Sequence, residues 1–166
     1  MSLKLVKSDT VVPTFQIELT ERQKTLIVES FTQFEPIVEY SAKVFFDRLA
    51  EVDPGLGAQL SGDSNVHSDK LATVLQIAVI SVRNLDALVP MLRLLGSEYR
   101  SYGARPEYYE TFGDVLLWTL EQGLGEAYTE EINEAWATLY GIIAEMMMHS
   151  GRVEKPEAAT GFGHAL

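Results

Sequence analysis

Apolar residues recur at steps of three and four along most of this chain, which is the spacing of one buried face of an α-helix. The clearest examples are residues 106–124 and 129–148, where the apolar positions persist over several helical turns. We find no internal repeat and no alternation of strands with helices. The spacing therefore predicts an all-α fold of about six or seven helices.

The first half of the chain predicts three helices with a break after the second. Thr20 and Gln23 form a capping-box pattern, in which two side chains satisfy free backbone donors at a helix start. A second helix is expected over about residues 36–51, followed by a Pro-Gly break and a turn, and a third over about 65–83. The residues that we expect the second helix to bury are Ile37, Tyr40, Val44 and Leu49, with Phe45 or Phe46.

A further helix is predicted over residues 85–102, ending at Gly103 before a new helix begins near Pro106. Its last turn carries Tyr99, between apolar positions that neighbouring helices would cover. One polar side chain directed into an apolar pocket is a common way for helical proteins to hold a cofactor.

The chain length of 166 residues is enough for one domain with its own core. We expect an N-terminal arm at 1–19 that lies against a domain at 20–148, and a flexible tail at 149–166 with a Gly, Ala and Pro bias. The methionines at 146–148 are interpreted as core and helix end rather than as a metal-binding motif.

Charge and composition exclude several classes of partner. The net charge of −11 disfavours nucleic acid and anionic membrane surfaces. Without cysteine there is no disulfide, thiolate metal site or thiol nucleophile. No apolar run reaches the roughly 18–20 residues of a membrane helix, and the first residues lack a secretory apolar core. We therefore expect a cytoplasmic protein without a nucleic-acid or membrane partner.

Four motifs resemble the globins, specifically the bacterial single-domain globins related to flavohaemoglobins. They are Asn84-Leu85-x-Ala87-Leu88-x-Pro90, Arg105-Pro106-Glu107-x-Tyr109, Leu116-Leu117-x-Thr119-Leu120 and Glu134-Ala135-Trp136-x-x-x-Tyr140. The resemblance covers about residues 20–148 and implies a globin fold with haem as its cofactor.

The resemblance places two unusual residues at the positions that face haem iron. Tyr99 falls where globins carry the proximal histidine, and His67, 32 residues earlier, falls at the distal position. No histidine lies between His67 and His149 to restore the usual ligand. Tyr99 and His67 are therefore the candidate iron ligands.

Other pocket positions partly match the family. Phe46 falls where these bacterial globins usually carry a tyrosine that donates to bound oxygen, and Leu60 falls where a phenylalanine wedges against the haem. Tyr109 and Trp136 match, whereas the supporting glutamate of flavohaemoglobins has no counterpart near Gly151. The candidate cofactor-binding residues are Phe46, Leu60, His67, Leu71, Leu95, Tyr99, Tyr109 and Trp136.

Each candidate ligand has two interpretations. A tyrosine phenolate can bind ferric haem, as in catalase. A phenol ionises at about pH 10 in water, so iron or a nearby cation must favour the anion. Alternatively, Tyr99 simply fills the pocket. His67 either faces the pocket, as a hydrogen-bond donor or an iron ligand, or is a half-buried boundary residue satisfied by solvent.

The first functional hypothesis is a haem-binding globin with Tyr99 proximal and His67 distal, which binds a small diatomic ligand. An anionic oxygen ligand favours ferric iron, so redox or haem sensing or ligand detoxification fits better than oxygen carriage. No catalytic motif supports an enzyme beyond haem redox chemistry.

The second hypothesis is a haem-free globin domain that acts as a signalling or interaction module. It predicts that Tyr99, Leu60, Phe46 and Leu95 close the cavity, and that the last two helices pair with a second copy through exposed faces near Trp118 and Tyr140. A third, minor hypothesis is a pocket for a lipid or another apolar ligand.

Overall fold

Helices account for nearly all of the chain that the computed structural model describes, namely residues 18–60, 64–101, 103 and 105–153. The α-helices are α1 (Glu21–Phe34), α2 (Val38–Val52), α3 (Pro54–Gln59), α4 (Ser64–Ile80), α5 (Val89–Ser101), α6 (Pro106–Leu124) and α7 (Glu130–Val153). Short 3-10 helices lie at η1 (Glu35–Ile37), η2 (Leu85–Leu88) and η3 (Gly125–Ala127). These residues contain no strand, so the all-α prediction is confirmed.

Side-chain caps fix the starts of α1 and α3. Thr20 Oγ1 accepts from the Gln23 backbone N–H, and Gln23 Oε1 accepts from the Thr20 backbone N–H, both at 3.0 Å. This is the capping box that the sequence predicts. Asp53 Oδ1 accepts from the Leu56 backbone N–H at 3.0 Å, and Pro54 occupies the first turn of α3. The predicted turn is therefore a short helix.

The buried face of α2 differs from the predicted one. Ile37 and Tyr40 were expected inside, but they are 37% and 70% exposed. The 3-10 turn η1 precedes α2 and, with three residues per turn, changes the angle at which the helix begins. The face that packs against the core consists instead of Val38, Ser41, Ala42, Phe45 and Leu49.

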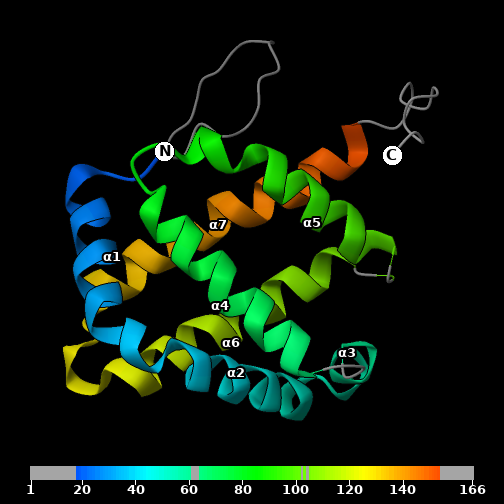
Figure 1. The fold of residues 1–166 in the computed structure, drawn as a ribbon, viewed down its shortest axis with the longest axis horizontal. Coiled ribbons are helices and arrows are strands. Elements are labelled where there is room, and N and C mark those ends of the chain that lie inside the picture. The colour runs from blue at the N-terminus through cyan, green and yellow to red at the C-terminus, as the bar shows by residue number, and fades with distance from the viewer. Residues whose placement is uncertain (1–17, 61–63, 102, 104, 154–166) are drawn as a thin grey trace.

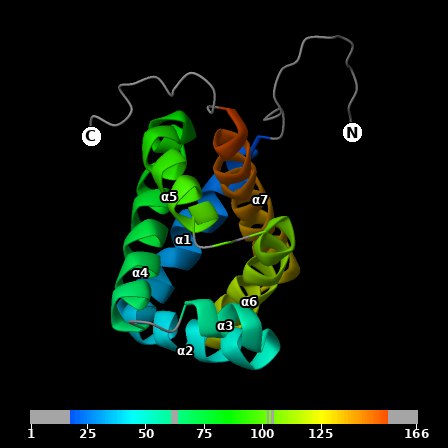
Figure 2. The ribbon, with the colours of Figure 1, turned by 90° about the vertical axis from the view of Figure 1, so that its right-hand side faces the viewer.

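The helices surround one apolar core. Figure 2 shows α4 and α5 on one side of the molecule and α6 and α7 on the other, and Figures 1 and 2 show α2 with α3 across one end. The side chains of Phe34, Phe45, Leu92, Leu120 and Trp136 are essentially inaccessible at the centre. α5 and α7 contribute opposite walls of the space described below.

A glycine sets the closest approach between two of these helices. A Cβ atom added to Gly96 of α5 would lie 2.4 Å from the backbone oxygen of Met147 in α7, and 3.1 Å from its Cα. Any side chain larger than hydrogen would therefore push the two backbones apart. Because Gly96 lies one turn before Tyr99, this crossing also sets where Tyr99 enters the interior.

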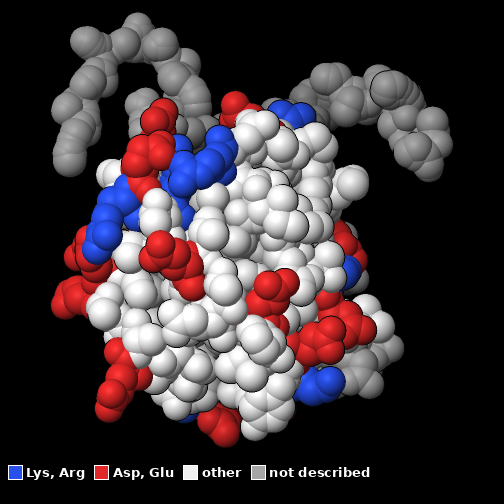
Figure 3. Space-filling model, turned by 60° about the vertical axis from the view of Figure 1, so that its left-hand side comes forward, with Lys and Arg blue, Asp and Glu red and all other residues white. Residues whose placement is uncertain are grey.

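Ion pairs tie α1 to later parts of the chain. Arg22 bonds to Glu131 of α7 at 2.8 Å, and Glu21 bonds to Arg83, after α4, at 2.7 Å. Figure 3 shows basic and acidic side chains side by side at the upper left of the face in view, acidic side chains scattered over its lower half, and an area without charged side chains at upper right. None of the described helices is long and apolar enough to cross a bilayer.

The predicted domain boundaries meet the structure only in part. α7 continues to Val153, five residues beyond the end predicted at Met148. The arm at 1–17 and the tail at 154–166 lie outside the described residues. The division into arm, domain and tail therefore stays a prediction.

Candidate functional site

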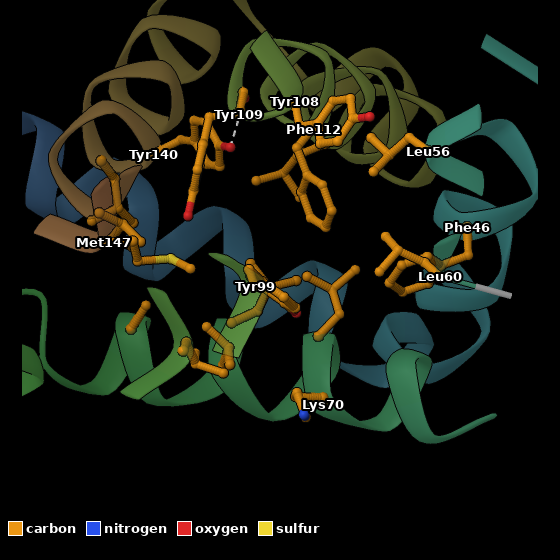
Figure 4. A pocket seen from close by; sticks show the side chains of 18 of the residues that line it. Phe46, Leu56, Leu60, Lys70, Tyr99, Tyr108, Tyr109, Phe112, Tyr140 and Met147 are labelled. Atoms are coloured by element: carbon orange, nitrogen blue, oxygen red, sulfur yellow. Dashed lines mark hydrogen bonds between the residues drawn. The ribbon is translucent and has the colours of Figure 1, made fainter. Parts of the chain in front are cut away.

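An apolar cavity of about 110 Å³ lies between α4, α5, α6 and α7, and is closed at one end by α2 and α3. Figure 4 shows Tyr99 on the α5 side, facing Phe112, Tyr109 and Tyr140 on α6 and α7. The cavity is lined by Phe46, Leu56, Gln59, Leu60, Lys70, Leu71, Val74, Leu75, Ala78, Leu95, Tyr99, Tyr108, Tyr109, Phe112, Leu116, Trp136, Leu139, Tyr140, Ile143 and Met147.

The structure brings together almost all of the predicted site residues. Seven of the eight, Tyr99 among them, line this one cavity, although they come from five different helices and the turn after α3. Periodicity places each residue on a helix face, and the packing of the helices places those faces opposite one another. The members are Phe46, Leu60, Leu71, Leu95, Tyr99, Tyr109 and Trp136.

His67 is the predicted residue that does not line the cavity. It lies on α4, one turn before Leu71, and its ring centroid is 5.9 Å from that of Phe46. Its Nδ1 atom is buried and has no hydrogen-bond partner in the structure. Phe46, which does line the cavity, therefore lies beside the imidazole, and the proposed role of His67 stays a prediction.

One charged side chain occurs among the described residues that line the cavity, and it is Lys70 of α4. Its Nζ atom lies 3.2 Å from Oε2 and 3.4 Å from Oε1 of Glu98 on α5. Both side chains are about one-third exposed, so this ion pair lies where the cavity approaches solvent. Glu98 is the residue directly before Tyr99.

Two tyrosines are fixed to each other on the α6–α7 side. The Tyr140 hydroxyl donates to the backbone oxygen of Tyr109 at 2.7 Å. Gly113 makes room for this contact, since a Cβ atom there would lie 2.7 Å from the Tyr140 ring. Burial raises the pKa of the Tyr140 phenol well above its usual range, and burial also raises the pKa of Tyr109, which nearby Arg100 partly offsets. Both phenols therefore stay neutral, and that of Tyr140 acts as a hydrogen-bond donor.

This arrangement corrects the dimer surface inferred from the sequence. Tyr140 was expected on an exposed face of the last helix, but it lines the cavity and is bonded to α6. Trp118 is half-buried, with the Arg48 guanidinium 4.7 Å from its ring centroid. The expected exposure of Tyr140 is therefore wrong, and the dimer itself stays a prediction.

Trp136 anchors the packing of α7 against α1. It is 1% exposed, and its indole Nε1 donates to Ser30 Oγ at 2.9 Å. The Ser30 hydroxyl in turn donates to the backbone oxygen of Leu26 at 2.7 Å. This chain of bonds satisfies the buried indole and joins α7 to α1.

Sequence reasoning missed Lys70, Tyr108 and Phe112 as cavity residues. Lys70 lies three residues after His67, so the helical period already placed it near the same face of α4. Tyr108 and Phe112 are on the α6 face that carries Tyr109 and Leu116. For Lys70 the missing information was the partner on α5, which only the tertiary structure supplies.

Comparisons with known proteins agree with this architecture. A family model described as Globin matches residues 38–147, which is more than half of the chain. Neuroglobin of Danio rerio is 29% identical over 144 residues, spanning 78% of this chain and 91% of that protein. The flavohemoprotein of Bacillus subtilis is 34% identical over 105 residues, spanning 61% of this chain and 26% of that longer protein. The resemblance therefore extends to neuroglobins as well as to flavohaemoglobins.

Solved structures have the same fold. A hexacoordinated heme protein from an anhydrobiotic tardigrade superimposes with a TM-score of 0.75 at 20% identity, covering 84% of this chain and 99% of that one. A flavohemoglobin from Malassezia yamatoensis, solved with bound FAD and heme, gives 0.70 at 19% identity, covering 81% of this chain and 37% of that one. Together with the family match over residues 38–147, this likeness in architecture leads to one conclusion: the chain belongs to the globin family.

Proposed function

We propose that this chain is a haem-binding globin in which Tyr99 supplies an axial oxygen ligand to ferric iron. The observation that carries the proposal is the position of Tyr99, which reaches an apolar cavity from the α5 side, opposite α6 and α7. The names of the matched proteins support the haem-binding part of the proposal, because they include a flavohemoprotein and a hexacoordinated heme protein. When bound, haem supplies redox chemistry and a site for diatomic ligands.

The chemistry of the cavity walls fits a porphyrin. The lining is almost entirely aliphatic and aromatic, which suits the faces of a large apolar ring. Tyr99 offers an oxygen donor for iron, and the Lys70 ammonium offers a charge-assisted contact for a carboxylate side group. The volume of about 110 Å³ is below the roughly 300–1,000 Å³ of typical ligand pockets, so side chains must move apart on binding.

His67 is the candidate for the opposite side. Its buried Nδ1 has no protein partner, so no hydrogen bond through that atom holds the imidazole in its present orientation. Its neighbour Phe46 forms part of the cavity wall. Turning the ring past Phe46 would bring it toward the space that Tyr99 faces.

Two features favour ferric chemistry over oxygen carriage. A phenolate oxygen stabilises the higher charge of ferric iron. Phe46 provides no hydrogen-bond donor at the cavity, so a bound dioxygen would receive no polar contact from that residue. We therefore propose redox or haem sensing, or detoxification of a reactive diatomic ligand, as the physiological role.

The test is a hemin titration followed by the ferric absorption spectrum, applied to the wild type, Tyr99→Phe and Tyr99→His. Tyr99→Phe should weaken hemin binding by about 10- to 100-fold or more, since even residues that only support metal ligands contribute that much. Tyr99→His should give a histidine-type spectrum. Tyr108→Phe removes a phenol from the same cavity and is the matched control. An unchanged spectrum and affinity in Tyr99→Phe would sink the proposal.

A second candidate is the haem-free interaction module. It is favoured by the small cavity volume and by the convergence of Tyr99, Leu60, Phe46 and Leu95 on that one space. In the same titration, this alternative predicts no saturable hemin binding by the wild type. The two candidates therefore give opposite results in one experiment.

A further inference from the structure

The ion pair between Lys70 and Glu98 has two roles in the geometry of the cavity. It places a carboxylate on the one charged side chain found among the described lining residues. It also joins α4 to α5, the two helices that form one side of the molecule in Figure 2. A ligand that brings a carboxylate group to this end of the cavity therefore meets a Lys70 ammonium that is already paired with Glu98.

We propose that Glu98 is an internal competitor for the ligand's carboxylate and so sets how tightly this site binds acidic porphyrins. The proposal rests on the proposed function, since it concerns the same cavity and the same ligand class. Lys70 already bonds to Glu98 at 3.2 and 3.4 Å, so a porphyrin carboxylate must either displace Glu98 or share the ammonium with it beside a like charge. In both cases the internal pair reduces the net attraction between Lys70 and the ligand.

Glu98 lies close to Tyr99, the candidate iron ligand. Glu98 directly precedes Tyr99 on α5, so the carboxylate that leaves Lys70 is on the same helical turn as the candidate axial oxygen. About one-third of the Glu98 side chain is already exposed, which allows the released carboxylate to turn into water. Removing the charge of Glu98 should therefore raise the affinity for acidic porphyrins, although the substitution leaves the side chains that line the cavity unchanged.

Iron-free protoporphyrin IX tests this inference without involving Tyr99 ligation. Its binding can be followed by quenching of tryptophan fluorescence, because Trp136 lines the cavity. Glu98→Gln should bind the porphyrin about two- to fivefold more tightly than the wild type, as expected for loss of one partly exposed ion pair. Lys70→Met should bind it more weakly, and Glu98→Gln should add nothing in the Lys70→Met background.

The porphyrin dimethyl ester, which carries no carboxylate, separates competition from a simple loosening of the helices. Its affinity should be equal in the wild type, Glu98→Gln and Lys70→Met. Matched controls with the same charge changes are Glu110→Gln and Lys43→Met, both at exposed positions away from the cavity lining. They should leave the affinity for both porphyrins unchanged.

Three results would overturn the inference. One is that Glu98→Gln binds protoporphyrin IX no more tightly than Glu110→Gln. Another is equal tightening toward the diester, which would show that helix release rather than charge is responsible. The third is the absence of saturable binding of protoporphyrin IX to any variant. Hemin titration of the same preparations decides the Tyr99 proposal separately, because iron ligation does not enter the porphyrin measurement.

Discussion

Gly96→Ala should destabilise this protein even though alanine is the better helix former. The substitution adds a Cβ atom 2.4 Å from the backbone oxygen of Met147, far inside van der Waals contact. The neighbouring atoms also belong to the Met147 backbone, at 3.0 and 3.1 Å, so no flexible side chain can move aside. Relief requires α5 and α7 to separate.

The size of the effect follows from two opposing terms. Replacing glycine by alanine inside a helix contributes about 1 kcal/mol in favour of folding. Overpacking a well-filled contact costs about 1–3 kcal/mol, and a contact with rigid backbone belongs near the upper end. The variant should therefore lose about 2 kcal/mol of unfolding free energy, or roughly 4–8 °C in Tm for a chain of this size.

Gly141→Ala is the matched control. Gly141 lies inside α7, but a Cβ atom added there meets nothing within 4 Å. This variant should be more stable than the wild type by up to about 1 kcal/mol. Urea unfolding followed by circular dichroism measures both variants. If Gly96→Ala were as stable as Gly141→Ala, the close crossing of α5 and α7 would be wrong.

Three further substitutions test other parts of the structure. Ser30→Ala should lower the unfolding free energy by about 1–3 kcal/mol, because the buried Trp136 indole loses its acceptor; urea unfolding and the Trp emission maximum report this. The hydrogen bond from Arg22 lowers the pKa of the Glu131 carboxyl from its ordinary value of 4.5. The ion pair therefore stabilises the fold above pH 4.5, and this stabilisation is lost as the pH falls through the lowered pKa of Glu131. The urea midpoint of Glu131→Gln should therefore fall less than that of the wild type between pH 7 and pH 3, and an equal fall would contradict the pairing. Burial, with a nearby carboxylate, raises the pKa of Tyr128 to about 12, so the folded state loses stability as pH rises from about 10 toward 12. Tyr128→Phe should reduce that alkaline loss, as measured by unfolding at pH 9 and pH 11.

The helices were predictable from the sequence because their signals are local. The capping box at Thr20 and the regular apolar spacing of α6 and α7 each depend on residues within a few turns. The face of α2 was not predictable in the same way. Ile37 and Tyr40 fit an apolar stripe, but the 3-10 turn before α2 changed the phase, and single-sequence periodicity does not contain that information.

The candidate site was partly predictable for a related reason. Family spacing identified Tyr99 as a cavity residue, because one ungapped stretch fixes its place on α5. It also placed His67 in the pocket, whereas His67 does not line the cavity, since the orientation of a side chain near a helix start depends on its neighbours, here Phe46. It did not identify the Lys70–Glu98 pair, whose members are 28 residues apart and meet only when α4 and α5 are packed.

The unpartnered Nδ1 of His67 has a consequence for ligand exchange. Histidines that bind metals strongly donate their second ring nitrogen to a carboxylate or a carbonyl, which fixes the ring and increases its basicity. His67 has no such support at Nδ1. If its other nitrogen reached the iron, the bond would be labile, and an incoming diatomic molecule would displace the imidazole at little cost. The rate at which the His67 imidazole leaves the iron would then set how fast this globin binds a diatomic ligand.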